Sequence, residues 1–257
     1  MNRIEKLFRD KRNNILSIYF TAGFPRLDDT LTMLTALQSH GADMIELGIP
    51  YSDPLADGPI IQHSSSIALL NGITIKKIFE QLKDFRNRIS VPVILMGYLN
   101  PVMKYGIEKF CEDAQAAGVD GLILPDLPLH EYEKEYKKLF KRHRLDFIFL
   151  ITPETSEQRI KKIDSLSKGF IYAVSSSSIT GVDKNMDAQL QYFERLENMK
   201  LKNPVMIGFG IKDHQTFVQA CAHANGAIIG TAYIRSIGNT DDIDFQTKQF
   251  INSILKG

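Results

Sequence analysis

Residues 43–62 read DMIELGIPYSDPLADGPIIQ, and this stretch predicts both a strand and a site. It begins as a strand, because Met44, Ile45 and Leu47 are apolar residues of the kind that parallel sheets bury. Gly48 and the proline two residues later then end the strand. We therefore predict a buried strand over the first residues of the stretch, followed by a long loop.

Two carboxylates stand out in this stretch. Glu46 lies among the apolar strand residues, and a buried carboxylate costs desolvation energy unless it is paired or used. Asp57 follows on a loop that Pro54 and Pro59 stiffen. A pair of carboxylates held in this way is typical of general acid/base chemistry, so we predict Glu46 and Asp57 as catalytic residues. The alternative for Glu46 is a strand-end residue that caps a helix or pairs with a lysine.

A strand followed by a helix recurs along the whole chain. We expect strands at residues 15–21, 43–47, 92–97, 119–124, 146–151, 169–174, 204–208 and 226–229. We expect helices at residues 28–40, 61–70, 74–85, 106–117, 130–142, 156–166, 187–199, 213–222 and 242–255, with a short amphipathic helix before the first strand.

Eight such units in 257 residues predict an α/β protein with the (β/α)8 TIM barrel fold and an extra N-terminal helix. The competing fold, a doubly wound open sheet, usually has a glycine-rich turn after its first strand, and residues 22–25 (AGFP) do not provide one. No linker or low-complexity segment interrupts the chain, so we expect residues 1–257 to form a single domain.

The composition excludes several classes of partner. Hydrophobic residues make up 44% of the chain, charged residues 24%, and the net charge is +1, which gives no reason to expect nucleic-acid or membrane binding. The N-terminal segment lacks the apolar centre of a signal peptide and contains acidic residues, so we expect a cytoplasmic protein. Cys111 and Cys221 form no Cys-x-x-Cys motif and are expected to be reduced, and the six histidines lack metal-ligand spacing, so we predict no metal.

In a barrel of this kind the active site lies at the carboxyl ends of the strands. Because side chains alternate along a strand, Glu46 is expected to point into the barrel mouth if Ile45 and Leu47 pack against helices. Tyr19 and Tyr172 end the first and sixth predicted strands and are expected to face the same mouth. The alternative for Tyr172 is a core aromatic whose hydroxyl group is hydrogen-bonded.

Two glycine-rich strand ends predict a phosphate site. The seventh and eighth strands end in Gly208-Phe-Gly-Ile and Gly230-Thr-Ala, and barrels often bind phosphate there through backbone N–H groups. Plain turns are the alternative. Residues 174–183 form a long polar loop that we predict to be a lid, with a flexible surface loop as its alternative.

These motifs together resemble the tryptophan synthase α subunit family. The specific match is the segment of residues 46–62, and shorter matches follow in the right order over almost the whole chain: residues 20–25 (FTAGFP), 124–128 (LPDLP), 179–181 (ITG) and 208–211 (GFGI). The resemblance implies retro-aldol cleavage of indole-3-glycerol phosphate to indole and glyceraldehyde 3-phosphate, without a cofactor.

The resemblance also implies roles for individual residues. Glu46 matches the main acid/base, Asp57 the carboxylate that hydrogen-bonds the indole N–H, and Tyr172 a tyrosine near the reacting glycerol chain. Further positions match the phosphate site (Gly181, Gly210, Gly230 and Thr231, the last where many relatives have serine), the indole pocket (Tyr19, Leu150 and Phe209) and a lid threonine that contacts Asp57 (Thr180). Ser178 departs from the family pattern, which has a glycine at this lid position.

The family works with a partner. The resemblance implies a tryptophan synthase β subunit in an αββα complex, with pyridoxal phosphate only in that partner, and Asp53 and Pro54 match the part of the loop that meets it. Two other functions remain open from the residues: another phosphate-binding barrel, such as a sugar-phosphate epimerase or isomerase, and a non-catalytic regulatory subunit. No metal-ligand set or opposed acid/base pair favours the first, and the intact Glu46 and Asp57 argue against the second.

Overall fold

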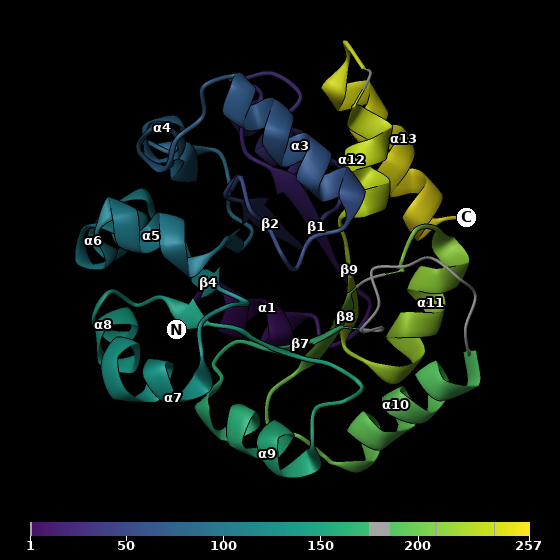
Figure 1. Ribbon diagram of the computed structural model, residues 1–257. Helices are drawn as coiled ribbons and strands as arrows, with labels where there is room; N and C mark the ends of the chain where they lie inside the picture. Colours follow the sequence, from purple (N-terminus) through teal and green to yellow (C-terminus); the bar gives the residue numbers. More distant parts are fainter. Residues whose placement is uncertain (1, 175–185, 209, 239) are drawn as a thin grey trace.

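A closed ring of parallel strands forms the centre of the molecule (Figure 1). The computed structural model describes the chain except residues 1, 175–185, 209 and 239. The strands are β1 (Ile15–Thr21), β2 (Met44–Gly48), β3 (Val93–Met96), β4 (Gly121–Ile123), β5 (Asp146–Phe147), β6 (Phe149–Ile151), β7 (Ile171–Val174), β8 (Val205–Gly208) and β9 (Gly226–Ile229).

The strand order β5-β4-β3-β2-β1-β9-β8-β7-β6 shows how the ring closes. Segments β5 and β6 are the two halves of one predicted strand, residues 146–151, separated only by Ile148. The first half pairs with β4 and the second with β7. The barrel therefore has eight strands, and the count of nine arises because the fifth strand is interrupted at Ile148. The predicted fold is confirmed.

Helices surround the barrel on its outside (Figure 1). They are α2 (Thr30–His40), α3 (Pro59–Leu70), α4 (Ile75–Gln81), α5 (Leu99–Tyr105), α6 (Ile107–Ala117), α7 (Leu129–Glu131), α8 (Lys137–Arg142), α9 (Glu157–Leu166), α10 (Met186–Asn198), α11 (His214–His223), α12 (Thr231–Ile237) and α13 (Ile243–Leu255). A 3₁₀ turn (Phe85–Asn87) follows α4, and a π-helical turn (Tyr132–Tyr136) joins α7 to α8.

Two helices differ from the sequence prediction. The segment around Asn100 and Pro101 was expected to be a loop, but it begins α5, where the proline lies in the first turn and removes no intrahelical hydrogen bond. Residues 230–232 were expected to be a loop after the last strand, but Gly230 is the N-cap of α12, which begins at Thr231.

The N-terminal helix α1 (Arg3–Asp10) covers one end of the barrel. Asn2 and Glu5 form a capping box that fixes its start. Its buried residues Ile4 and Phe8 pack with Met44, Ile94 and other side chains that fill the barrel interior. The predicted extra helix thus serves as a plug for the barrel core. Within the part of the chain that the structure describes, no helix is long and apolar enough to cross a membrane.

The alternation expected along β2 is present. Ile45 and Leu47 belong to the hydrophobic cluster between the strands and the helices, whereas Met44 belongs to the cluster inside the barrel. Glu46 therefore shares the inner face with Met44. Cys111 is buried and Cys221 is half-buried, and both thiols are free, as expected for reduced cysteines.

Candidate active site

Glu46 lies inside the barrel without any exposure to solvent. One of its carboxyl oxygens, Oε1, accepts a hydrogen bond of 3.0 Å from the hydroxyl group of Ser17 on β1. The other, Oε2, has no hydrogen-bond partner among the described residues. Burial raises the pKa of Glu46 to about 8, and the Ser17 hydroxyl group opposes that shift because it stabilises the ionised form. Glu46 can therefore hold or release a proton near neutral pH.

Asp57 is half-buried on the loop between β2 and α3. Burial raises the pKa of its carboxyl group to about 6, and a hydrogen bond with Tyr98 opposes the shift. At neutral pH Asp57 is thus mostly ionised while Glu46 is mostly protonated. Two carboxyl groups with separated pKa values can take the two roles of acid and charge-stabilising anion.

Tyr98 supports the loop that carries Asp57. Besides its contact with Asp57, its hydroxyl oxygen accepts a hydrogen bond from the backbone N–H of Ala56 at 3.0 Å. Its ring lies 5.4 Å from that of Tyr51, whose hydroxyl oxygen accepts a hydrogen bond from the Asn100 amide at 3.0 Å. Tyr98 was not predicted from the sequence, where its only signal is its place as an aromatic residue just after the third predicted strand.

A cavity of about 80 Å³ lies at the carboxyl ends of the strands. It is lined by the predicted residues Tyr19, Asp57, Tyr172, Gly210, Gly230 and Thr231, together with Ile61, Met96, Ile211 and Ile228, which were not predicted. The structure therefore brings together residues from the first, second, third, sixth, seventh and eighth units of the barrel.

Several predicted residues do not line this cavity. Glu46 lies beside it. Burial is the main cause of the raised pKa of the Tyr19 and Tyr172 hydroxyl groups, and the nearby charge of Glu46 adds to that rise. Leu150 is partly buried and packs against the cluster inside the barrel, so its predicted place in the indole pocket is not seen among the cavity residues. Thr180, Gly181 and Phe209, like the predicted lid and Ser178, lie outside the described residues.

Two glycines make room for the tyrosines. A Cβ atom at Gly48 would lie 2.2 Å from the hydroxyl oxygen of Tyr19, and one at Gly208 would lie 2.2 Å from the ring of Tyr172. Both distances are far below van der Waals contact. These glycines end β2 and β8, and the sequence could show that they end strands but not which ring would rest on them.

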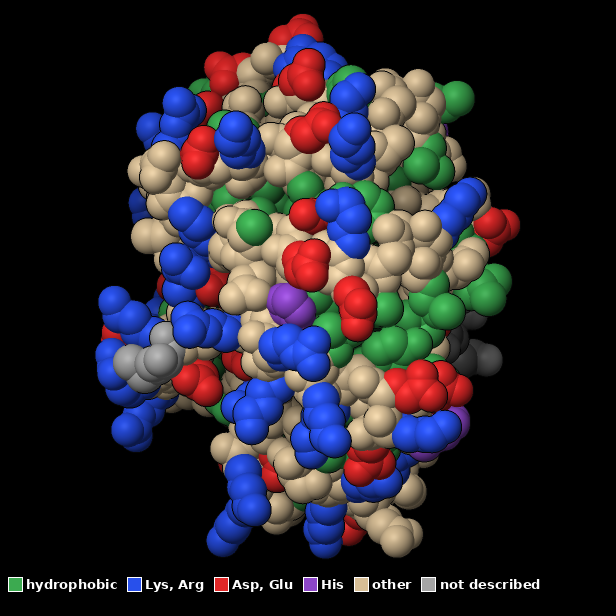
Figure 2. All heavy atoms as spheres, turned by 90° about the vertical axis from the view of Figure 1, so that its left-hand side faces the viewer, with side chains coloured by type: hydrophobic (Ala, Val, Ile, Leu, Met, Phe, Trp, Pro, Cys, Tyr) green, Lys and Arg blue, Asp and Glu red, His purple; other side chains and the backbone are tan. Residues whose placement is uncertain are grey.

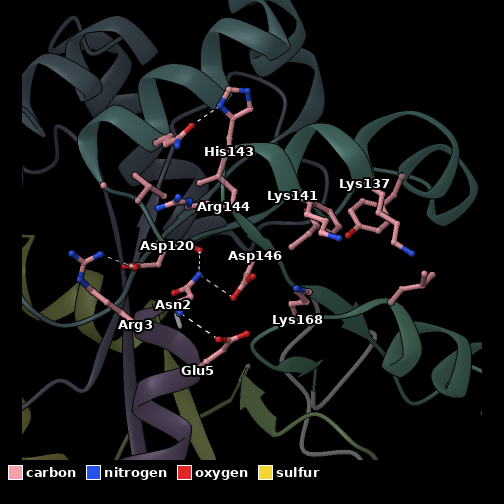
Figure 3. A pocket seen from close by; sticks show the side chains of 17 residues that line it. Asn2, Arg3, Glu5, Asp120, Lys137, Lys141, His143, Arg144, Asp146 and Lys168 are labelled. Carbon is pink, nitrogen blue, oxygen red and sulfur yellow. Dashed lines mark hydrogen bonds and ion pairs between the residues drawn. The ribbon is translucent and has the colours of Figure 1, made fainter.

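A larger cavity, of about 970 Å³, lies at the opposite end of the barrel (Figure 3). Three of its charged residues lie where strands begin: Asp120 comes just before β4, Asp146 is the first residue of β5, and Lys168 comes shortly before β7. Arg3 binds Asp120 at 3.1 Å, and the Asn2 amide donates a hydrogen bond of 3.0 Å to Asp146, so these carboxylates attach α1 to the barrel. Because residues at this end of a barrel contribute to stability, we assign the cavity no catalytic role.

The fold and the cavity define a class, the (β/α)8 barrel enzymes whose reacting groups lie at the carboxyl ends of the strands. The family model described as tryptophan synthase alpha chain matches residues 5–255. The chain belongs to the tryptophan synthase alpha chain family.

Individual relatives agree with this assignment. The tryptophan synthase alpha chain of Flavobacterium psychrophilum is 54% identical over 257 residues, covering 99% of this chain and 100% of the relative. That of Phocaeicola vulgatus is 50% identical, covering 100% and 98%. The crystal structure of tryptophan synthase subunit alpha from Legionella pneumophila superposes with a TM-score of 0.89 at 34% identity, covering 99% of this chain and 97% of that one. These relatives favour the main prediction over an epimerase or isomerase.

Proposed function

We propose that this chain cleaves indole-3-glycerol phosphate to indole and glyceraldehyde 3-phosphate by a retro-aldol reaction that requires no cofactor. The family assignment supports the reaction. The observation that carries the site is the pair of carboxyl groups near the cavity, one with a pKa of about 8 and the other with a pKa of about 6.

The chemistry requires two proton transfers. The bond between indole C3 and the glycerol chain breaks only after C3 has become tetrahedral, so the protonated Glu46 first donates its proton to C3. The positive charge that develops on the indole nitrogen is stabilised by the ionised Asp57, which accepts the N–H hydrogen bond.

The second transfer uses the same glutamate as a base. The Glu46 carboxylate removes the proton of the hydroxyl group on the carbon attached to C3, and that carbon becomes the aldehyde of glyceraldehyde 3-phosphate. The electrons of the broken C–C bond return to the ring and regenerate indole. Glu46 ends the cycle protonated, as it began, so one carboxyl group with a raised pKa serves both steps.

We place the phosphate group at Gly210, Gly230 and Thr231. All three line the cavity, and Gly230 is the N-cap of α12, whose first backbone N–H groups have no intrahelical partner. We assign Tyr19, Met96 and Ile228, which also line the cavity, to an aromatic and apolar wall for the indole ring, and Tyr172 to the reacting glycerol chain.

The test is whether the purified chain produces indole from indole-3-glycerol phosphate. Glu46→Gln should lower turnover by roughly 10²–10⁴-fold, because it removes the acid/base group. Glu112→Gln, an exposed position on α6, is the matched control and should retain activity. A Glu46→Gln variant with more than about a tenth of the wild-type turnover would contradict the assignment.

The pH dependence follows from the two carboxyl groups. Glu46 acts in its protonated form, so kcat/KM should fall as the pH rises through about 8. Asp57 acts in its ionised form, so activity should fall as the pH drops through about 6. The basic limb is diagnostic, because the acid limb overlaps the second ionisation of a phosphate monoester at about pH 6. A rate that stays constant from pH 6 to 9 would exclude Glu46 as the acid.

We further infer that the chain acts in the cytoplasm as part of an αββα complex with a tryptophan synthase β subunit. The alpha chain family supports a β partner in general, and the exposed Leu55 on the loop of Asp57 supports a contact there. Pyridoxal phosphate would belong to the partner alone. Size-exclusion chromatography with light scattering on the mixed subunits tests the stoichiometry.

A further inference from the structure

Ser17 is a fully buried polar residue on β1 whose side chain faces the barrel interior beside Glu46. Its hydroxyl group donates the 3.0 Å hydrogen bond to Glu46 Oε1, which is the one hydrogen bond of that carboxyl group among the described residues. A serine on the inner face of a barrel strand otherwise adds polarity where apolar packing would be more favourable.

The register of β1 and β2 shows toward which end of the barrel the Glu46 carboxyl group points. Tyr19 is the partner of Glu46 across β1 and β2, whereas Ser17 is the partner of Met44, two residues closer to the N-terminal end. Tyr19 lines the cavity, but neither Ser17 nor Glu46 does. The Glu46 carboxyl group is therefore turned away from the cavity and toward the plugged end of the barrel.

We propose that Ser17 is a positioning residue that holds the Glu46 carboxyl group beneath the cavity in the free protein and releases it when the substrate binds. This inference rests on the proposed function, because it gives Ser17 a role through the acid/base group. Ser17 touches no substrate atom. It acts by fixing the position of the Glu46 carboxyl group in the free protein and by influencing how readily that group releases its proton.

The hydroxyl group stabilises the ionised carboxylate, so it counteracts the effect of burial on Glu46. Among the described residues, the other titratable groups near Glu46 are Tyr19 on β1 and Tyr172 on β7, and the charge of Asp57 also acts on both tyrosines. Burial raises the pKa of both tyrosines well above its ordinary value, so they stay protonated in the range where Glu46 titrates. Removal of Ser17 therefore acts on one titrating group.

The experiment is Ser17→Ala, with pH profiles of both kcat/KM and kcat for indole production. The kcat/KM profile reports pKa values of the free enzyme, and the kcat profile those of the substrate complex. We expect the basic limb of kcat/KM to move up by about half a unit to one unit, because a hydrogen bond to the ionised form is lost. The basic limb of kcat should not move, since Glu46 has left Ser17 in the complex.

Two further variants separate this role from a structural one. Ser17→Thr keeps the hydroxyl group and should restore the wild-type limb. Ser64→Ala removes another fully buried hydroxyl group, which bonds Thr21 at 2.7 Å rather than Glu46, and should leave both limbs in place. If Ser17→Ala does not fold, Ser17→Cys offers nearly the same volume with a weak donor. Its basic limb of kcat/KM should also move to higher pH.

The outcomes are distinct. An unchanged kcat/KM limb in Ser17→Ala would overturn the positioning role, and equal shifts in both profiles would overturn the release on substrate binding. If the basic limb persists in Glu46→Gln, the limb belongs to another group and the proposed acid/base role of Glu46 fails instead.

Discussion

At the scale of single residues, Glu46 links the stability of the protein to pH. Its carboxyl group has a pKa near 4.5 in water but about 8 in the folded chain, so ionisation is costly only in the folded state. The folded state binds the extra proton, so the contribution of Glu46 to the free energy of unfolding is highest below pH 4.5 and falls as the pH rises from about 4.5 through 8.

Glu46→Gln should remove this dependence. The free energy of unfolding of wild type relative to Glu46→Gln should fall by roughly a few kcal/mol between pH 5 and pH 9. Denaturant unfolding at both pH values measures the difference and needs no substrate. If the difference in unfolding free energy between wild type and Glu46→Gln is the same at pH 5 and pH 9, Glu46 ionises in the folded chain as it does in water.

Gly208 determines whether Tyr172 can occupy its place. A Cβ atom at this position would lie 2.2 Å from the tyrosine ring, so Gly208→Ala must displace Tyr172. We expect a loss of about 1–3 kcal/mol in unfolding free energy and a strong loss of indole production. Gly238→Ala is the control, because its φ of −62° is helical and its nearest neighbour would be 3.5 Å away. Normal activity in Gly208→Ala would show that the position of Tyr172 is not critical.

The position of a side chain could be predicted from the sequence where it depends on the alternation along a single strand. The alternation of residues 44–47 placed Glu46 on the inner face of the barrel, as the two hydrophobic clusters confirm. It could not find Ser17 or Tyr98, because their contacts depend on the register between strands and on the path of a loop. Those relations arise from tertiary packing, which no local pattern encodes.

At the scale of elements, periodicity and glycine punctuation located every barrel strand and most helices. The break at Ile148 escaped prediction, since residues 146–151 form an unbroken apolar run after Asp146. Helix α12 was not predicted either, because Gly230-Thr-Ala is typical of a loop after a strand. Both features depend on tertiary structure: residues 146–147 pair with β4 and residues 149–151 pair with β7, and α12 packs against β1 and α13.

We expect the start of α12 to bind the phosphate group of the substrate. Gly230→Asp places a negative charge at its N-cap beside the cavity, and we expect the affinity for glycerol phosphate to fall roughly tenfold or more, about 1.4 kcal/mol. Gly230→Asn is the matched control, since it adds nearly the same volume without the charge and should bind more tightly than the aspartate variant. Calorimetry that finds wild-type affinity in a folded Gly230→Asp protein would place the phosphate elsewhere.

At the scale of the whole molecule, the surface offers a route by which a partner can act on the site. Figure 2 shows hydrophobic side chains gathered on part of the side that carries α5 and α6. Met103 on α5 is 55% exposed, and Leu55, on the loop that carries Asp57, is 88% exposed. Pro54, which the resemblance places at the partner contact, is buried in the isolated chain. The hydrogen bond from Ala56 to Tyr98 connects that loop to the segment before α5.

A β subunit that covers Leu55 would therefore restrict the loop and fix Asp57 against the cavity, a population shift driven by contacts that only one loop arrangement makes. Addition of the cognate β subunit should raise the rate of indole formation at least roughly tenfold, or about 1.4 kcal/mol of barrier. Leu55→Ser should reduce this activation more than it reduces the basal rate.

Leu70→Ser is the matched control for this experiment, because Leu70 is 87% exposed but lies at the far end of α3, away from the loop. It should leave activation intact, since the same apolar-to-polar change there removes no contact near Asp57. Rates of indole formation measured with and without the β subunit give the activation for each variant, and binding is checked in parallel by light scattering. Equal rates with and without a bound β subunit would disprove the coupling, and equal loss of activation in both serine variants would place the contact away from the Asp57 loop.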